Sequence, residues 1–258
     1  MGSRNDRSQD AGGHRFQDAV GHPDAAASAG SWRHSAVLFD MDGTLIDSES
    51  VWFEAGSKLL EGLVDDLPAD AADQLHGLDL DAVVRWLVAH GVAVDRDEYL
   101  GRLLETVEPL LPAAPAREGA QEWVCAVAAA GLRRAIVSNS PRSVIDATLS
   151  SRAWARQLEV RVSIEDVGRG KPAPDLYVFA ARRLGVAPAD CLVLEDSRVG
   201  ASAAVEAGAT CLLVTFGTIA EHEARRITPL VAADLPAAWR LVAALDGSPL
   251  QGGLASAT

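Results

Sequence analysis

The sequence is poor in the residues that mark several classes of protein. Its three cysteines, Cys125, Cys191 and Cys211, lie far apart without a Cys-x-x-Cys pair, so a disulfide scaffold is excluded and buried free thiols in a reducing, cytoplasmic setting are expected. No run of about 18 apolar residues occurs, which argues against a membrane-spanning helix. The polar N-terminus also lacks the apolar segment of a secretory signal.

Basic residues are also scarce. Lys and Arg number 23 against 36 Asp and Glu, a net charge of −13, and so acidic a chain repels a polyphosphate backbone. We therefore expect no nucleic-acid partner and no membrane partner, and a monomer or weak homo-oligomer. The 258 residues are 48% apolar, which is enough for a full hydrophobic core. Residues 1–31 and 246–258 carry few large apolar side chains and are predicted to be loose tails.

Between these tails, short apolar runs alternate with helical patterns. The runs predict buried parallel strands at 36–39, 134–137, 158–162, 191–194 and 210–214. Helices are expected near 119–130, 142–150, 174–185 and 198–207. This alternation predicts an α/β fold, a doubly wound parallel sheet with a Rossmann-like core.

One long segment interrupts the alternation. From about Ser48 to Leu111 only helical periodicity occurs, with apolar faces such as 83, 84, 87 and 88, and the segment ends in Pro109, Pro112 and Pro115. We therefore predict an all-helical insertion over 48–115, and an α/β core built from 32–47 and 116–245.

Four polar clusters follow predicted strands or lie close to them. They are Asp40-Met41-Asp42-Gly43-Thr44, Ser138-Asn139-Ser140, Lys171-Pro172 and Glu195-Asp196-Ser197. In an open α/β sheet, ligands bind at the carboxyl ends of the strands. Asp40 and Asp196 are natural ligands for a divalent cation, and Lys171 could bind a phosphoryl oxygen. Each cluster alone is also explained as a turn, a helix cap or a solvated lysine, but all four in this order are not.

These residues resemble a known family. The stretch from Phe39 to Ser48 resembles the first motif of the haloacid dehalogenase superfamily of phosphohydrolases, and Ser138, Lys171 and Glu195-Asp196 resemble its next three motifs. The stretch 194–200 with the alanines at 203 and 204 resembles the branch that holds beta-phosphoglucomutase and the sugar-phosphate phosphatases. The helical insertion resembles that branch's α-helical cap.

The resemblance implies an Mg2+-dependent phosphatase of small phosphate monoesters, with a sugar or polyol phosphate as substrate and an aspartyl-phosphate intermediate. Asp40 is then the nucleophile and Asp42 the general acid and base, while Lys171 stabilises the transferring charge. The implied magnesium ligands are Asp40, the Asp42 carbonyl, Asp196 and, directly or through water, Glu195. The implied phosphate contacts are Thr44, Ser138 and Asn139.

Two other functions stay open, a mutase and a non-catalytic ligand-binding protein on the same fold. Mutases of this branch carry a histidine, a lysine and an arginine where this chain has Trp52, Pro141 and Leu80. The pattern is therefore more similar to sugar-phosphate phosphatases of the 2-deoxyglucose-6-phosphatase type. His76, in a stretch that resembles the cap's specificity loop, is the first candidate for a substrate contact, although an exposed loop histidine explains it equally well.

Overall fold

The computed structural model describes residues 32–61, 63, 68, 71–75 and 80–246. Six parallel strands form one sheet in the order β3-β2-β1-β4-β5-β6. The strands are β1 (Ala36–Phe39), β2 (Arg133–Val137), β3 (Val160–Val162), β4 (Cys191–Glu195), β5 (Thr210–Val214) and β6 (Leu230–Ala232). This is the doubly wound order, in which the chain leaves β1 toward both edges, so the predicted fold class is confirmed.

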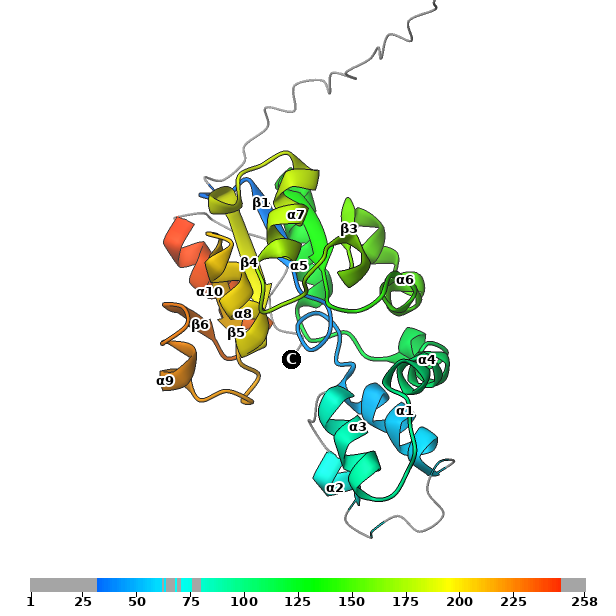
Figure 1. Cartoon of the computed structure of the whole chain (residues 1–258). Helices are drawn as coiled ribbons and strands as arrows, with labels where there is room; N and C mark the ends of the chain where they lie inside the picture. The colour runs from blue at the N-terminus through cyan, green and yellow to red at the C-terminus, as the bar shows by residue number, and fades with distance from the viewer. Residues whose placement is uncertain (1–31, 62, 64–67, 69–70, 76–79, 247–258) are drawn as a thin grey trace, which may run out of the picture.

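Helices separate and follow these strands (Figure 1). The α-helices are α1 (Glu49–Glu61), α2 (Ala71–Leu75), α3 (Leu80–Ala89), α4 (Arg96–Val107), α5 (Ala120–Ala129), α6 (Arg142–Ser150), α7 (Asp175–Leu184), α8 (Arg198–Glu206), α9 (Glu221–Ala224) and α10 (Leu235–Asp246). Short 3-10 helices are η1 (Leu111–Ala113), η2 (Ala153–Gln157), η3 (Ile164–Asp166) and η4 (Pro188–Asp190).

Alternate residues of each strand enter two separate cores. Val37 and Phe39 of β1 pack on one face with Trp123 of α5 and the neighbouring helices α6 and α10. Ala36 and Leu38 pack on the other face, against α7 and α8. Because both faces of the sheet are covered by helices, the strands read as unbroken apolar runs in the sequence.

The strand register aligns the ends of β2, β1 and β4. Phe39 lies opposite Ile136 on one side and Leu194 on the other. Asp40, which directly follows β1, and Glu195, the last residue of β4, are therefore neighbours at the carboxyl edge of the sheet. This is the topological switch point of the fold, where a crevice is expected.

Helices α1 to α4 lie beyond this edge and have an apolar core of their own (Figure 1). The core is made by Leu59, Leu60, Leu75, Leu87 and Tyr99. The two connections to the sheet run side by side, since Asp47 N–H donates to the Pro115 carbonyl and Arg117 N–H to the Leu45 carbonyl, each at 2.9 Å. The segment predicted to be all-helical contains helices and no strand among its described residues.

The structure also differs from the sequence-based expectations. The strand expected over 158–162 begins at Val160, because η2 occupies the chain up to Gln157. Val88, expected on the apolar face of α3, is 57% exposed, whereas Leu87 beside it is fully buried. Strand β6 and helix α10 were not predicted. No helix in the described part of the chain is long and apolar enough to cross a membrane.

Candidate active site

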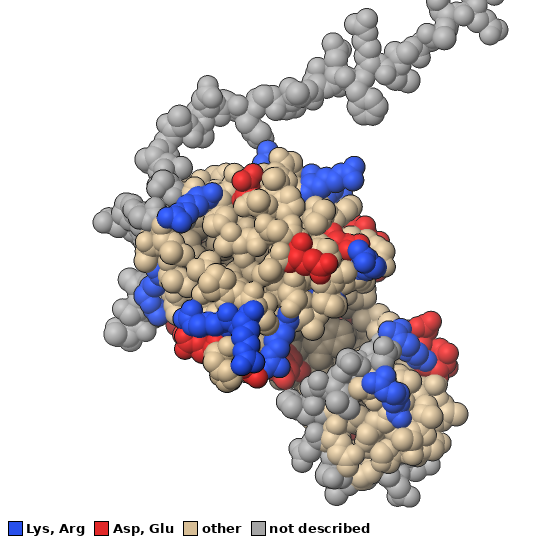
Figure 2. All heavy atoms as spheres, turned by 60° about the vertical axis from the view of Figure 1, so that its left-hand side comes forward, with Lys and Arg blue, Asp and Glu red and all other residues tan. Residues whose placement is uncertain are grey.

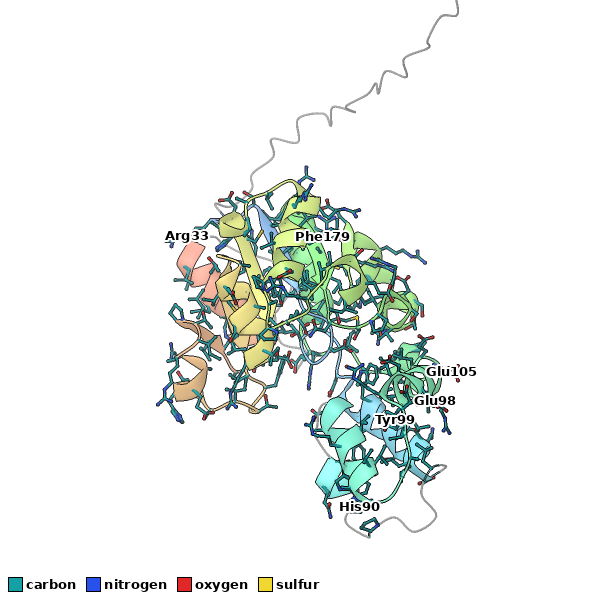
Figure 3. All side chains as sticks on the ribbon, in the orientation of Figure 1. Arg33, His90, Glu98, Tyr99, Glu105 and Phe179 are labelled. Atoms are coloured by element: carbon teal, nitrogen blue, oxygen red, sulfur yellow. The ribbon has the colours of Figure 1, made fainter. Side chains whose placement is uncertain are left out.

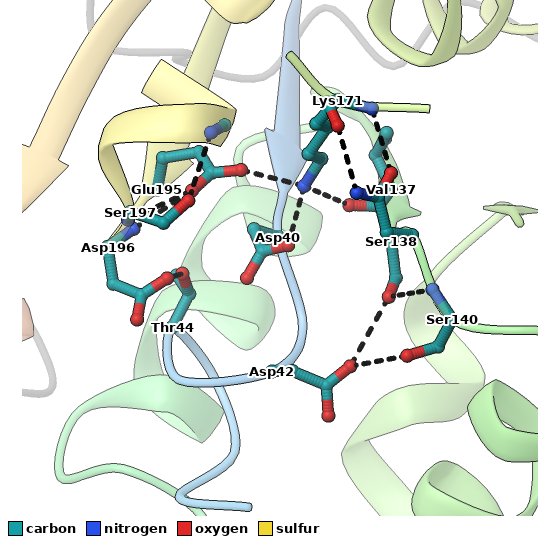
Figure 4. Close-up of polar contacts among 12 residues, drawn as sticks. Asp40, Asp42, Thr44, Val137, Ser138, Ser140, Lys171, Glu195, Asp196 and Ser197 are labelled. Carbon is teal, nitrogen blue, oxygen red and sulfur yellow. Dashed lines mark hydrogen bonds and ion pairs between the residues drawn. The ribbon is translucent and has the colours of Figure 1, made fainter. Parts of the chain in front are cut away.

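Lys171 lies at the centre of the polar cluster at the carboxyl edge of the sheet (Figure 4). Its Nζ is 2.6 Å from Asp40 Oδ1 and 2.7 Å from Glu195 Oε1, and it donates to the Val137 carbonyl at 2.9 Å. The lysine side chain is only 4% exposed. Burial alone would lower the pKa of Lys171, but the carboxylates of Asp40 and Glu195 outweigh it and raise that pKa above its usual value. Lys171 is therefore a fixed cation.

Both carboxylate oxygens of Glu195 accept hydrogen bonds from the protein. Oε1 accepts from Lys171 and from the hydroxyl of Tyr177 at 2.7 Å. Oε2 accepts from the hydroxyl of Ser197 at 3.0 Å and from the backbone N–H groups of Asp196 and Ser197 at 3.2 Å. A buried carboxylate needs such partners, and these bonds fix Glu195 in the position from which it holds Lys171.

Asp40 has one oxygen without a protein partner. Oδ1 accepts from Lys171, whereas the buried Oδ2 makes no hydrogen bond. One oxygen each of Asp40, Glu195 and Asp196 lie within 4.8 Å of one another. Burial raises the pKa of Asp40 well above its usual value; Lys171 opposes the rise, and the other two carboxylates add to it. An orphaned buried oxygen within a group of close carboxylates fits a divalent cation bound by oxygen ligands.

Asp196 lies beside the loop that follows β1. Thr44 donates from its hydroxyl to Asp196 Oδ1 at 3.0 Å. Burial and the charge of Glu195 raise the pKa of Asp196 to about 7. Gly43, at φ +85°, leaves the room that this carboxylate occupies, because a β-carbon there would lie 2.1 Å from Asp196 Oδ2. The glycine of the first motif is thus required by both backbone conformation and close approach.

Three hydroxyl groups hold the Asp42 carboxylate. Ser48 donates to Oδ1 at 2.8 Å, and Ser140 and Ser138 donate to Oδ2 at 2.9 and 3.3 Å. Ser48 begins the connection to α1, whereas the other two serines follow β2. Asp42 therefore links the loop after β1 to the start of the helical insertion through Ser48. It also links that loop to the loop after β2 through Ser138 and Ser140 (Figure 4).

Of the other residues expected at the site, Asn139, Thr44 and Ser138 lie among the described residues, whereas His76 does not. The side chain of Asn139 bonds the backbone of Lys171, accepting from its N–H at 2.8 Å, so it positions the lysine loop. Its expected phosphate contact, and those of Thr44 and Ser138, stay predictions. His76 lies outside the described residues.

Two tryptophans of the helical insertion pack on other protein side chains. Trp52 is partly buried against the sheet core. Trp86 stacks on His90 at 3.8 Å, and Figure 3 places His90 in the helical insertion, away from the sheet.

Sequence reasoning missed several residues of the cluster. Tyr177 and Arg117 were not singled out, since neither belongs to a pattern that identifies a partner. Ser140 and Ser48 lie within the motifs quoted above, but no role was assigned to either. A weak signal existed for Ser197, because a serine before a helix is a common N-cap, and its side chain does accept from Gly200 N–H. Ser197 is the N-cap of α8.

Comparison with known proteins identifies the family. The model of the haloacid dehalogenase-like hydrolases matches residues 34–208. The chain belongs to this family, and the membership expected from the motifs is confirmed.

Two curated relatives and one solved structure are similar to the chain over most of the matched region. Fructose-1-phosphate phosphatase of Escherichia coli is 30% identical over 193 residues, 68% of this chain and 94% of that protein. Hexitol phosphatase B of the same species is 33% identical over 173 residues, 63% and 75% of the two chains. A family hydrolase from Deinococcus radiodurans, solved with bound phosphate and sodium, is 32% identical with a TM-score of 0.65, covering 85% and 98%.

Proposed function

We propose that this protein is an Mg2+-dependent phosphatase that hydrolyses a small phosphate monoester, a sugar or polyol phosphate, through a phosphorylated Asp40. The observation that carries the proposal is the buried Asp40 carboxylate, held at one oxygen by Lys171 and without a protein partner at the other. Such an oxygen is available to a cation or to an electrophilic phosphorus. The relatives named as phosphatases of fructose 1-phosphate and of hexitol phosphates support the substrate class.

Asp40 and Asp196 would hold the Mg2+ ion, together with the backbone carbonyl of Asp42. When bound, Mg2+ supplies positive charge that offsets repulsion between these carboxylates and the anionic ester. Glu195 would assist through water, or directly once one of its present hydrogen bonds opens, because both of its oxygens already accept from the protein. Its other task is to position Lys171.

In the first step, an Asp40 carboxylate oxygen attacks phosphorus and the bond between phosphorus and the ester oxygen breaks. Asp42 donates a proton to the departing oxygen, which leaves as an alcohol. Lys171 remains against Asp40 and neutralises charge on the transferring phosphoryl group. The hydroxyl groups of Thr44 and Ser138, and Asn139, would orient the phosphoryl oxygens.

In the second step, water attacks the phosphorus of phosphorylated Asp40. Asp42, now ionised, takes a proton from that water, and inorganic phosphate leaves as the Asp40 carboxylate is restored. The Ser48, Ser138 and Ser140 hydroxyl groups keep the Asp42 carboxylate near this reaction. Positioning and charge neutralisation would account for most of the catalysis, as in other phosphoryl transfers.

We further infer that the helical segment over 48–115 acts as a cap on a core made of 32–47 and 116–245. Helices α1 to α4 form an apolar core apart from the sheet, and both of their connections leave from beside the site. His76 of this segment stays the first candidate for a substrate contact from the cap.

The deciding experiment measures phosphate release from a panel of sugar and polyol phosphates, with Mg2+ and with EDTA. We expect turnover with Mg2+ and none with EDTA or in Asp40→Asn. Asp146→Asn is the matched control and should keep full activity. It removes an exposed carboxylate of α6 that pairs with Arg161 of β3. Turnover that survives both EDTA and Asp40→Asn would contradict the proposal.

The same preparation distinguishes the two other functions. With β-glucose 1-phosphate and a bisphosphate primer, we expect free phosphate and glucose; appearance of glucose 6-phosphate would indicate a mutase. Tight binding of phosphate esters without any turnover would indicate a binding protein.

A further inference from the structure

A pocket of 430 Å³ opens beside the acidic cluster. Its walls come from the loop after β1, the connection that leads into α5, the start of α8 and the loop after β5. They include Asp42, Arg117, Asp196, Arg198, Phe216 and Thr218. Because the general acid Asp42 and the proposed metal ligand Asp196 both line it, the pocket borders the point where the ester bond breaks. Figure 2 shows the surface narrowing to a hollow where the larger part of the molecule meets the smaller one, with basic and acidic side chains nearby.

Two cations line this pocket among the described residues, and carboxylates already pair with both of them. Arg117 is 3.1 Å from Asp47 Oδ2 and donates from Nε to the Gly43 carbonyl at 3.0 Å. Arg198 pairs with Glu223 of α9. The positive charge of each guanidinium is therefore already balanced by a carboxylate of the protein, and neither is free to bind a second anionic group of a ligand.

The wall contributed by the loop after β5 is partly apolar. Phe216 and Ile219 line it beside the hydroxyl-bearing Thr218. Phe216 has φ +44°, a left-handed conformation that is unfavourable for a residue with a side chain. It is held there by a hydrogen bond from its N–H to the Ala233 carbonyl at 2.9 Å and by Arg117, whose guanidinium carbon lies 4.6 Å from the ring centroid.

We propose that this pocket is the subsite for the leaving group and that it selects an uncharged polyhydroxyl group over one that carries a second phosphate or a carboxylate. The inference rests on the proposed phosphatase function and deepens it. Phe216 and Ile219 offer an apolar surface to the C–H groups of a polyol, and Thr218 offers a hydroxyl. The proposed Mg2+ ion would be taken up by the reacting phosphoryl group. A second anionic group would instead face the carboxylates of Asp42 and Glu49, and both arginines of the pocket are already paired.

The paired cations give the first test. Wild type should prefer a hexitol 6-phosphate to the matching hexitol 1,6-bisphosphate by about tenfold or more in kcat/KM. Glu223→Gln leaves the Arg198 charge uncompensated at the pocket wall, so at low ionic strength it should reduce that preference by about threefold. Glu221→Gln is the matched control, because it frees Arg225 of the same helix region, which does not line the pocket. A preference that is absent in wild type, or unchanged in Glu223→Gln, would overturn the inference.

The aromatic wall gives the second test. Phe216→Leu should lower kcat/KM for the hexitol phosphate by about tenfold. It should leave hydrolysis of acetyl phosphate, whose leaving group carries no polyol, within about twofold. Phe179→Leu is the control, since Phe179 also stacks with an arginine but lies on α7, away from the site (Figure 3). Equal loss on both substrates would assign Phe216 a structural role and overturn the inference.

These outcomes separate the subsite from the function on which it rests. If wild type hydrolyses acetyl phosphate with Mg2+ but shows no preference among larger esters, the subsite inference alone fails. If wild type releases phosphate from none of the substrates, the proposed function fails and the subsite fails with it.

Discussion

A β-carbon at Gly200 would lie 1.7 Å from Oε1 of Glu195, the oxygen that binds Lys171. Only glycine at this position of α8 leaves room for the glutamate that holds the lysine.

Gly200→Ala should therefore inactivate the enzyme although it improves helix propensity. Alanine is favoured over glycine within a helix by about 0.8–1.0 kcal/mol, but the clash must displace Glu195 and release Lys171. We expect kcat to fall by about a hundredfold or more. Gly101→Ala in α4 is the control, because a β-carbon there meets nothing within 4 Å; it should raise the melting temperature and keep full activity. An active Gly200→Ala enzyme would show that Glu195 need not hold its present position.

Tyr177→Phe tests the other partner of the same glutamate oxygen. The change removes the 2.7 Å hydrogen bond from the tyrosine hydroxyl to Glu195 Oε1 and leaves the ring in the core. Glu195 Oε1 keeps its other donor, Lys171. Losing the tyrosine hydrogen bond should therefore lower the free energy of unfolding by about 1 kcal/mol. We expect kcat to fall several-fold while KM stays constant, because the substrate does not touch the hydroxyl. Denaturant unfolding and steady-state kinetics check both values, and a changed KM with an unchanged kcat would contradict the positioning role.

The contrast between Asp40 and Tyr177 shows what the sequence can predict. Asp40, Ser138 and Glu195 end strands or directly follow them, so a local apolar run and its polar end were enough to place them at one edge of a sheet. Tyr177 reaches Glu195 only because α7 packs on the sheet, and no local pattern encodes that contact. The same holds for Gly200, whose requirement depends on a side chain that folds back over the helix start.

The elements missed in the core have a similar explanation. Strand β6 has three residues, Leu230–Ala232, too few for a periodic pattern, and it is defined by its pairing with β5. The proposed leaving-group pocket could not be predicted from the sequence either, because Arg117 and Phe216, which meet at its wall, lie about a hundred residues apart in the chain. The four motifs predicted the chemistry, whereas the wall of the pocket required the folded structure.

Asp166→Asn should lower stability in a pH-dependent manner. Partial burial alone would raise the pKa of Asp166, but the Ser163 N–H at 2.8 Å and the Arg142 guanidinium hold that pKa below its usual value. A lowered folded-state pKa contributes stability that is present above the unfolded pKa of about 4 and is lost as the pH falls through the folded value. We expect a loss of about 1 kcal/mol at pH 7, which shrinks as the pH falls below the unfolded pKa and through the lowered folded one. Urea unfolding at several pH values measures it, and a difference that is constant with pH would contradict this linkage.

Lys171→Met should abolish turnover and make the protein depend on Mg2+ for its stability. Removing the ammonium leaves Asp40 and Glu195 buried without their cation, which should cost about 3–5 kcal/mol. A divalent ion that binds only the folded state then stabilises the variant more than wild type, because more negative charge remains around it. We expect a larger Mg2+-induced rise in melting temperature for Lys171→Met at pH 8.

Lys58→Met is the control for that measurement. Lys58 makes an exposed ion pair with Glu54 on α1, and its loss should change stability by less than about 1 kcal/mol. Its response to Mg2+ should equal that of wild type. Calorimetric titration of Mg2+ into wild type, Asp196→Asn and Lys171→Met completes the comparison, since the ion should bind less tightly to Asp196→Asn and more tightly to Lys171→Met. Equal affinities in all three would place the magnesium site away from these carboxylates.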